Sequence, residues 1–283
     1  MTATTRPLYS DEHEGVDQDE HLPFGHFAPD GRQKALIALA RASFLHRGLF
    51  RGAVTRAVMG SAGGPLDVRF RDCAYRLRGL DNSIQSGLLL NPNYNATDLD
   101  FLIEGVPSGG TFLDIGANIG LYTLPLAKRA GPAGKVVAID ANRLMARRLA
   151  WNARASGIDN IAIFPCAVSD HEGMGSLSLR KNNIASAALA DDSEGGIVIR
   201  TLPSILAEAG TTRIDGLKID VEGHEDRVLA PFLETCDDEL LPARIVIERP
   251  NGSDDYPGCR AAFKNRGYRP VGRSRYNSFY MLG

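Results

Sequence analysis

The stretch TFLDIGANIGLYT, residues 111–123, contains the strongest structural signal in the chain. Thr111 to Ile115 is mostly apolar and predicts a buried strand. Gly116 and Gly120 follow, and because they lack a β-carbon the backbone can turn sharply and approach a ligand closely there. A helix is predicted after this loop, with Asn118 suited to its N-cap. A strand, a glycine loop and a helix in this order are typical of α/β domains.

Strands and helices continue to alternate from about residue 95 to the C-terminus. This alternation predicts a doubly wound, mostly parallel sheet. Pro125 falls inside the first helix of this region and should kink it or delay its start. The other predicted strands are 135–139, 161–164, 216–219, 244–248, a hairpin of 177–179 with 197–201, and an antiparallel pair within 268–282, and the other predicted helices are 98–104, 144–156, a short one from Pro203, and 225–233.

The segments before residue 95 have a different character. Residues 1–30 are acidic and poor in apolar groups, which predicts a disordered or loosely docked tail. Residues 31–94 are expected to form an accessory region, and 95–283 the main domain. Within the accessory region, residues 32–59 predict a basic helical pair packed on the main domain, and 67–78 a two-stranded ribbon. Alternatively, residues 32–58 form a surface helix that makes a peripheral contact with anionic lipid or touches a polyanionic substrate.

The composition excludes several classes of protein. The net charge of −2 gives the chain no overall bias toward nucleic acid. Its four cysteines are far apart and form no C-x-x-C pair, which fits a reducing compartment rather than a disulfide or zinc framework. The N-terminus lacks the pattern of a secretory signal, and no window approaches the roughly 18 apolar residues of a membrane span. A cytoplasmic location and no transmembrane segment are therefore expected.

The acid at the end of the first strand indicates which cofactor the glycine loop binds. The loop matches neither the G-x-G-x-x-G dinucleotide fingerprint nor the G-K-[S/T] of a P-loop. Asp114, two residues before Gly116, would repel a pyrophosphate but can pair with the ammonium group of a methionine moiety. The pattern therefore favours S-adenosylmethionine over NAD or ATP.

A second acid, Asp140, ends the next strand twenty residues beyond Gly120. A carboxylate at that place can accept hydrogen bonds from both hydroxyls of an adenosyl ribose. Alternatively, Asp140 or Asn142 is simply the N-cap of the following helix.

The segment KIDVEGHE, residues 218–225, concentrates ionisable groups at the end of another strand. Lys218 and Asp220 project from the same face of that strand. Crowded ionisable groups at a strand end are typical of a reactive site, and methyl transfer to a hydroxyl needs a base. Asp220, Glu222 or His224 could be that base. Alternatively, the acids bind magnesium or manganese, which we do not favour, or they form a solvated helix start with Glu225 in its first turn.

Residues 111–123 resemble the opening motif of the FkbM family of S-adenosylmethionine-dependent methyltransferases, and residues 217–225 resemble its second hallmark. The segment 167–170, with Gly173, is similar to the link that follows the third strand of the family. The likeness covers about residues 95–282. It implies a seven-stranded class I methyltransferase fold, preceded here by a helical and β-ribbon extension, and O-methylation, often of a sugar hydroxyl in a glycan, glycolipid or natural product.

The resemblance also implies roles for particular residues. The chain departs from the family pattern in reading Asp140-Ala141 for Glu-Pro, Thr201-Leu202-Pro203 for Thr-Leu-Asp, and Cys166 where many class I enzymes place an acid for the adenine. The resemblance implies that the cofactor contacts include Asp114, Gly116, Asn118, Gly120 and Asp140 and that the acceptor side includes Asp220, Glu222 and Glu225. We further expect Ala117, Ala141 and Ala167 beside the cofactor, and Lys218 and His224 beside the acceptor.

Taken together, these features predict an S-adenosylmethionine-dependent O-methyltransferase acting on a small-molecule or glycan acceptor. One alternative is a nucleic-acid methyltransferase that uses the basic residues 32–56 to bind phosphates. Another is a regulatory module that binds the cofactor without catalysis, which the intact acidic cluster disfavours.

Overall fold

The predicted strand 111–115 is β3 (Thr111–Ile115), which lies inside a seven-stranded sheet of order β12-β13-β11-β10-β3-β4-β5. The computed structural model describes residues 17, 19–79, 83–179, 187–250 and 255–283. The strands β11, β10, β3, β4 and β5 are parallel to one another, whereas β13 pairs antiparallel with both β11 and β12. This confirms the predicted mostly parallel sheet, whose other strands are β4 (Lys135–Ile139), β5 (Ile161–Phe164), β10 (Gly216–Ile219), β11 (Arg244–Glu248), β12 (Tyr268–Arg273) and β13 (Asn277–Leu282).

The chain enters this sheet at β3, builds outward through β4 and β5, and then returns to add β10 and β11 on the other side of β3. The connections therefore change direction between β3 and β10. In open parallel sheets the crevice at such a switch point, beyond the carboxyl ends of the strands, is where ligands bind. The glycine loop and the 218–225 segment both begin at this crevice.

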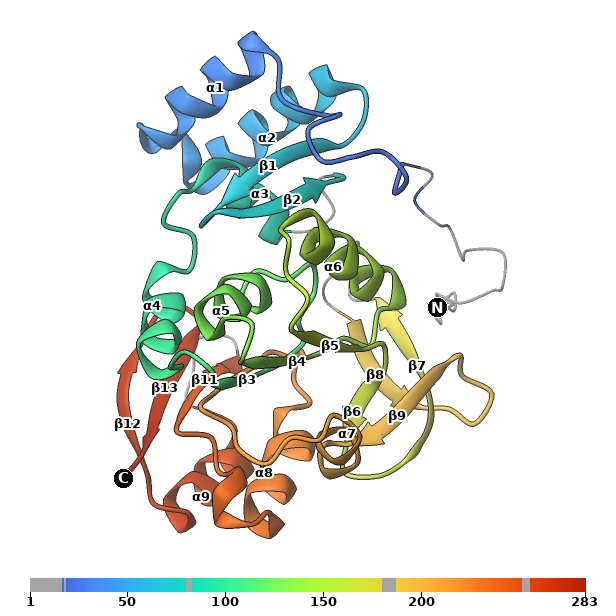
Figure 1. Ribbon diagram of the computed structural model, residues 1–283, viewed down its shortest axis with the longest axis vertical. Helices are drawn as coiled ribbons and strands as arrows, with labels where there is room; N and C mark the ends of the chain where they lie inside the picture. The colour runs from blue at the N-terminus through green and yellow to red at the C-terminus, as the bar shows by residue number, and fades with distance from the viewer. Residues whose placement is uncertain (1–16, 18, 80–82, 180–186, 251–254) are drawn as a thin grey trace, which may run out of the picture.

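Helices cover both faces of the sheet (Figure 1). Along β3, Phe112 packs into the hydrophobic cluster on one face and Leu113 into the cluster on the other, and both are fully buried. This burial on both faces explains why the strands are continuous apolar runs. One face is covered by α4 (Ala96–Gly105), α5 (Thr123–Ala130) and α6 (Arg143–Ala155), and the other by α7 (Leu202–Glu208), α8 (Glu225–Thr235) and α9 (Pro257–Asn265), with a short 3-10 turn at Asp238–Leu240.

Pro125 delays the start of its helix, which was one of the two predicted outcomes. The helix α5 begins at Thr123, so Pro125 lies in the first turn, where no backbone N–H is needed.

A separate four-stranded sheet of order β6-β9-β7-β8 stands beside the main one. The predicted hairpin of 177–179 with 197–201 was wrong in its pairing. The antiparallel partners of β9 are Gly173–Gly175, and Leu177 instead pairs with Leu189 of β8. The strand β8 was not predicted because it lies within the polar segment 182–196. Residues 182–186 of that segment lie outside the described part of the chain. The four strands are β6 (Ala167–Ser169), β7 (Gly173–Leu179), β8 (Ala187–Asp191) and β9 (Ile197–Thr201).

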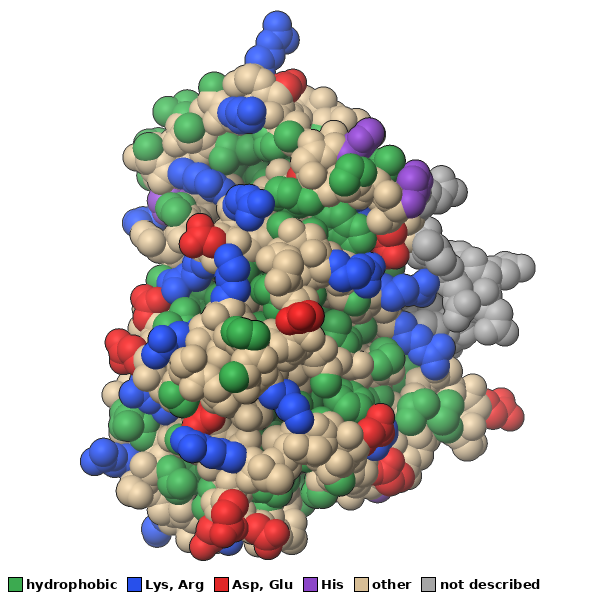
Figure 2. Space-filling view, viewed as in Figure 1, with side chains coloured by type: hydrophobic (Ala, Val, Ile, Leu, Met, Phe, Trp, Pro, Cys, Tyr) green, Lys and Arg blue, Asp and Glu red, His purple; other side chains and the backbone are tan. Residues whose placement is uncertain are grey.

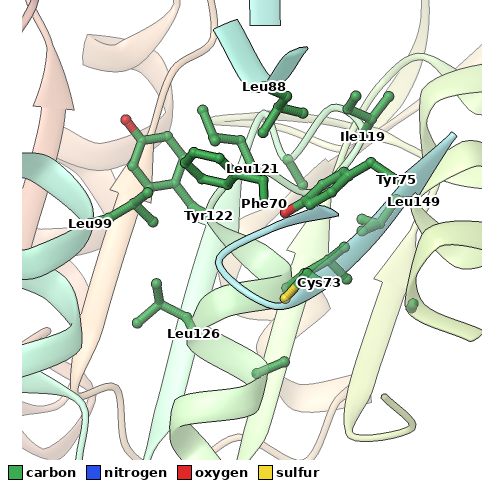
Figure 3. Close-up of a cluster of buried hydrophobic side chains, with 14 of the residues drawn as sticks. Phe70, Cys73, Tyr75, Leu88, Leu99, Ile119, Leu121, Tyr122, Leu126 and Leu149 are labelled. Carbon is green, nitrogen blue, oxygen red and sulfur yellow. The ribbon is translucent and has the colours of Figure 1, made fainter. Parts of the chain in front are cut away.

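The accessory region packs on the α5–α6 side of the main domain (Figure 1). In Figure 3, Cys73 and Tyr75 of the ribbon lie among Leu126 of α5 and Leu149 of α6. The Tyr75 hydroxyl also donates a hydrogen bond to the carbonyl of Gly120, 3.1 Å away, so the ribbon supports the glycine loop. The region consists of α1 (Gly31–Arg41), a 3-10 turn (Phe44–His46), α2 (Gly48–Ala62), β1 (Leu66–Phe70), β2 (Cys73–Leu77) and α3 (Ser83–Leu90).

Residues 19–30 are docked on the ribbon, so the loose tail expected over 1–30 does not extend to them. Arg76 is buried against Asp67, 2.8 Å away, and its remaining N–H groups donate to the carbonyls of Asp19, Leu22 and Pro23. A buried guanidinium needs acceptors for all its N–H groups, and this segment supplies them. Residues 1–16 and 18 lie outside the described residues. Among those described, no helix has both the length and the apolar character that crossing a membrane requires.

Candidate active site

The glycine loop fits tightly between the ends of two neighbouring strands. The N–H groups of Gly116 and Ala117 both donate to the carbonyl of Ile139, at 2.9 and 3.0 Å. Gly116 has a φ of +84°, and a β-carbon there would lie 1.9 Å from the carbonyl oxygen of Asp220. Only glycine fits this position, which brings the loop backbone against the end of β10.

Asn118 does not cap the following helix, contrary to the prediction. It adopts a left-handed φ of +49°, its N–H donates to Asp140, and the residue before α5 is Tyr122. The cap of α6 is Asn142, whose side chain accepts from the N–H of Leu144 at 3.0 Å.

Asp140 joins the glycine loop to the start of α6. Its carboxylate oxygens accept from the N–H of Asn118 at 2.7 Å and of Asn142 at 2.8 Å. Burial raises the pKa of Asp140 to about 6, an effect that these two backbone hydrogen bonds oppose. The side chain still lines a cavity at the switch point, where its oxygens can accept further hydrogen bonds.

Asp114 lies beneath the loop rather than on the surface of the cavity. It is fully buried, accepts a short hydrogen bond from the hydroxyl of Thr123, and is in register with Lys218 on the adjacent strand. Burial raises the pKa of Asp114 to about 6. Its Oδ1 atom is buried without a hydrogen-bond donor among the described residues. Asp114 therefore lies beneath the glycine loop and does not itself line the cavity.

The residues of the 218–225 segment separate into two groups. Asp220, Glu222 and His224 line the cavity, whereas Lys218 and Glu225 do not. Lys218 is buried, with its Nζ atom 3.3 Å from Asp220 Oδ2. The segment thus presents two carboxylates and an imidazole to the cavity.

Glu225 holds the shape of the loop that carries these groups. It is fully buried, and its two oxygens accept from the N–H of Val221 at 2.9 Å and of Gly223 at 3.0 Å. Burial raises the pKa of Glu225.

The Nε2 atom of His224 lies 3.0 Å from the hydroxyl oxygen of Ser169, and burial lowers the pKa of this histidine. A lowered pKa favours the neutral imidazole.

Sequence reasoning missed Glu248 at the end of β11. Ile219 and Ile247 are in register, so Asp220 and Glu248 are close neighbours at the ends of two parallel strands. Carboxylate oxygens of Asp220, Glu225 and Glu248 lie within 4.8 Å of one another. Burial and then the charge of Asp220 raise the pKa of Glu248 far above its usual range, which favours the protonated form of Glu248. The signal that could have identified Glu248 was a charged residue at the carboxyl end of an apolar strand.

The cavity at the switch point has a volume of about 1030 Å³, at the upper end of the range of ligand pockets, about 300–1,000 Å³. One side comes from the main domain and includes Gly116, Asn118, Asp140, Ala141 and Ala167 among the expected cofactor contacts. Ala117, Gly120 and Asp114 do not line it. The other side comes from residues of the accessory region, from 91–98 and from 274–277. The cavity has room for a cofactor and an acceptor together.

The FkbM methyltransferase domain model matches residues 114–270, which is more than half of the chain. The chain belongs to the FkbM methyltransferase family. It is therefore an S-adenosylmethionine-dependent methyltransferase, and its main sheet has the seven strands that the resemblance implied.

This FkbM methyltransferase is similar to methyltransferase sdnD of Sordaria araneosa, with 29% identity over 211 residues, covering 61% of this chain and 78% of the relative. Among solved structures, TYW2 of M. jannaschii in complex with AdoMet matches with a TM-score of 0.40 and 14% identity over 77% of this chain and 87% of that one. An S-adenosylmethionine-dependent O-methyltransferase of Thermotoga maritima matches with a TM-score of 0.41 and 16% identity over 74% and 73% of the two chains.

Proposed function

We propose that the protein transfers a methyl group to a hydroxyl of a sugar, in a glycan, a glycolipid or a glycosylated natural product, and works in the cytoplasm. The observation that carries this proposal is the Asp220–Glu248 carboxyl pair, which lines the same cavity as the glycine loop. Hydroxyl acceptors need a base close to the reacting oxygen, and this pair provides one.

The residues around the glycine loop fit S-adenosylmethionine. Asp140 lines the cavity and offers its carboxylate to the ribose hydroxyls. Gly116 allows the loop backbone to lie against the carbonyl of Asp220, which brings the cofactor-side loop next to the acceptor-side residues. Cys166, whose pKa is raised to about 11 by burial, remains a neutral thiol on the cavity surface beside Val168. This apolar part of the cavity suits an adenine ring.

When bound, S-adenosylmethionine supplies an electrophilic methyl group, and the chain itself manages the acceptor and its proton. Asp220 accepts the proton of the acceptor hydroxyl while the hydroxyl oxygen forms the new bond to the carbon of the methyl group. Lys218, whose Nζ atom lies 3.3 Å from Asp220 Oδ2, and the protonated Glu248 orient the Asp220 carboxylate. Glu225 positions the loop through its two backbone hydrogen bonds. Catalysis then depends on the alignment of the acceptor oxygen with the methyl group.

A carbohydrate acceptor is supported by the polar side of the cavity. Asn91, Asn93, Asn95, Thr97 and Ser274 line it. Amide and hydroxyl side chains both donate and accept hydrogen bonds, as the hydroxyls of a sugar do. The resemblance to FkbM enzymes that modify sugars supports the same acceptor class.

The test is incubation of the full-length protein with methyl-labelled cofactor and fractionated cell glycans, lipids and RNA. We expect label in saccharide-containing fractions, as an alkali-stable ether. Label only in RNA, or in no fraction, would overturn the sugar assignment.

The same assay tests the base. Asp220→Asn should lower the rate about 10²–10⁴-fold while leaving the calorimetric affinity for the cofactor within a small factor of wild type. The matched control Glu234→Gln removes an exposed carboxylate of α8 outside the cavity and should leave both quantities unchanged. A wild-type rate in Asp220→Asn would exclude Asp220 as the base.

A further inference from the structure

Arginines line the part of the cavity that is contributed by the accessory region and the β12–β13 turn. One of them, Arg41, is already engaged, because its guanidinium donates to the carbonyls of Leu88 and Leu89. The other three form what we call the arginine rim: Arg47 before α2, Arg51 in the first turns of α2, and Arg275 between β12 and β13. These segments are more than 200 positions apart, yet they line one cavity.

The arginine rim carries uncompensated positive charge. Within the part of the chain that the structure describes, no carboxylate lies within 4 Å of any of its three guanidinium groups, although Arg76, Arg148 and Arg227 elsewhere are ion-paired. The acids that line the cavity are Asp98, Asp140, Asp220, Glu222 and Glu248, which come from α4 and from the strand ends of the main domain. Charge of both signs therefore lines the cavity, and the acids come from other segments of the chain than the arginine rim.

Local contacts orient two of the rim side chains. The Nε–H of Arg47 donates to His46 Nε2 at 3.0 Å, and His46 Nδ1 lies 3.2 Å from the carbonyl of Ala40. A neutral histidine with its proton on Nδ1 satisfies both contacts, which leaves the two terminal amino groups of Arg47 available. Arg275 lies over the ring of Tyr276, 5.0 Å from its centre, and Arg249 fixes their turn by donating to the carbonyls of Ser274 and Arg275.

We propose that the acceptor carries a phosphate group that binds to the arginine rim, while its hydroxyl lies at Asp220. The inference rests on the proposed function, because it assigns a substrate class to the same cavity. Arginine presents a planar set of donors that matches phosphate oxygens, and several arginines that line one cavity suit a group with more than one negative charge better than a single carboxylate.

The phosphate is not that of a long nucleic acid, since the rim is confined to one cavity. On the face shown in Figure 2, Lys and Arg side chains are interspersed with acidic and hydrophobic ones rather than forming a continuous basic track. A phosphate-linked sugar has two common sources, a water-soluble nucleotide and a lipid. Phe44 and Phe50 pack edge to face with their ring centres 5.4 Å apart, and 65% and 54% of their surfaces are exposed. They are close in sequence to Arg47 and Arg51 and form a surface that a lipid chain could contact.

The first test measures binding without catalysis. Inorganic pyrophosphate is titrated by calorimetry into full-length protein saturated with S-adenosylhomocysteine. We expect binding to the wild type, a loss of affinity of about tenfold or more in Arg47→Glu/Arg51→Glu, and a smaller loss in Arg275→Ala. The control Arg56→Glu makes the same charge reversal as each of these two replacements, at an exposed position of α2 outside the cavity, and should bind as wild type does. No binding to the wild type, or equal loss in the control, would overturn the proposal.

The second test identifies the phosphate source and separates this inference from the proposed function. Labelled product from cell extract is divided between water and organic solvent and passed over an anion exchanger before and after phosphate-ester cleavage. Labelled product that the anion exchanger retains before cleavage but not after it supports the inference. Such product in the water phase indicates a nucleotide-linked sugar, and such product in the organic phase indicates a lipid-linked sugar. A labelled sugar ether that the anion exchanger does not retain even before cleavage would overturn the proposal of a phosphorylated acceptor and leave the proposed function intact. Label in RNA alone would overturn both.

Discussion

Replacing Gly116 with alanine tests whether the glycine loop and the end of β10 share space as the structure shows. The added β-carbon would lie 1.9 Å from the carbonyl oxygen of Asp220, and real contacts of a β-carbon are essentially never shorter than 3.0 Å. The two backbone segments must therefore separate by about 1.1 Å, and neither is the flexible end of a side chain. The residue also has a φ of +84°, which alanine adopts only at a cost.

The expected loss of stability has two parts. The left-handed conformation costs about 1–2 kcal/mol for a residue with a β-carbon. The enforced separation adds about 1–3 kcal/mol, as overpacking does in other well-packed sites. Gly109→Ala is the matched control, because Gly109 has a φ of +78° and nothing lies within 4 Å of the point where the added methyl group would sit. The control should lose only the first part.

Unfolding in denaturant gives the free energies, and calorimetry gives the affinity for S-adenosylmethionine. We expect Gly116→Ala to be less stable than Gly109→Ala by about 1–3 kcal/mol and to bind the cofactor much more weakly, because the loop shifts. Gly109→Ala should bind the cofactor as wild type does. Equal stability of the two variants, with full cofactor affinity in both, would show that the loop does not press on the Asp220 backbone.

Three further outcomes are expected. Asp140→Ala should weaken calorimetric cofactor binding about tenfold or more while the circular dichroism spectrum stays native, and wild-type affinity would refute the ribose assignment. Glu225→Ala removes the buried carboxylate that accepts from the N–H groups of Val221 and Gly223 and should lower the free energy of unfolding in denaturant by about 1–3 kcal/mol, whereas an unchanged value would show that the loop does not depend on Glu225. Glu248 has a raised pKa, so above its ordinary value of 4.5 the folded state binds a proton that the unfolded state has released, and stability falls as pH rises. Glu248→Gln should flatten that decline, and an unchanged slope would contradict the raised pKa of Glu248.

Much of the main domain was predictable because its signals are local. The five parallel strands begin and end at the predicted residues, since each is an apolar run bounded by polar or glycine residues. The glycine loop and Asp140 were located in the same way, because strand ends in a parallel sheet meet at one edge. Pairing among weaker strands was not local: β8 lies in a segment of small and polar residues, and the expected hairpin missed it.

The sequence by itself determined the sheet, the loop at residues 114–120 and the family, because these depend on apolar periodicity and on short motifs. Only the tertiary structure decided which charged groups meet. The order of the strands puts Glu248 beside Asp220, burial removes Asp114 from the cavity surface, and the accessory region brings Arg47 and Arg51 to the same cavity. These contacts join residues far apart in the chain, and a pattern that reads neighbours along the sequence contains no information about them.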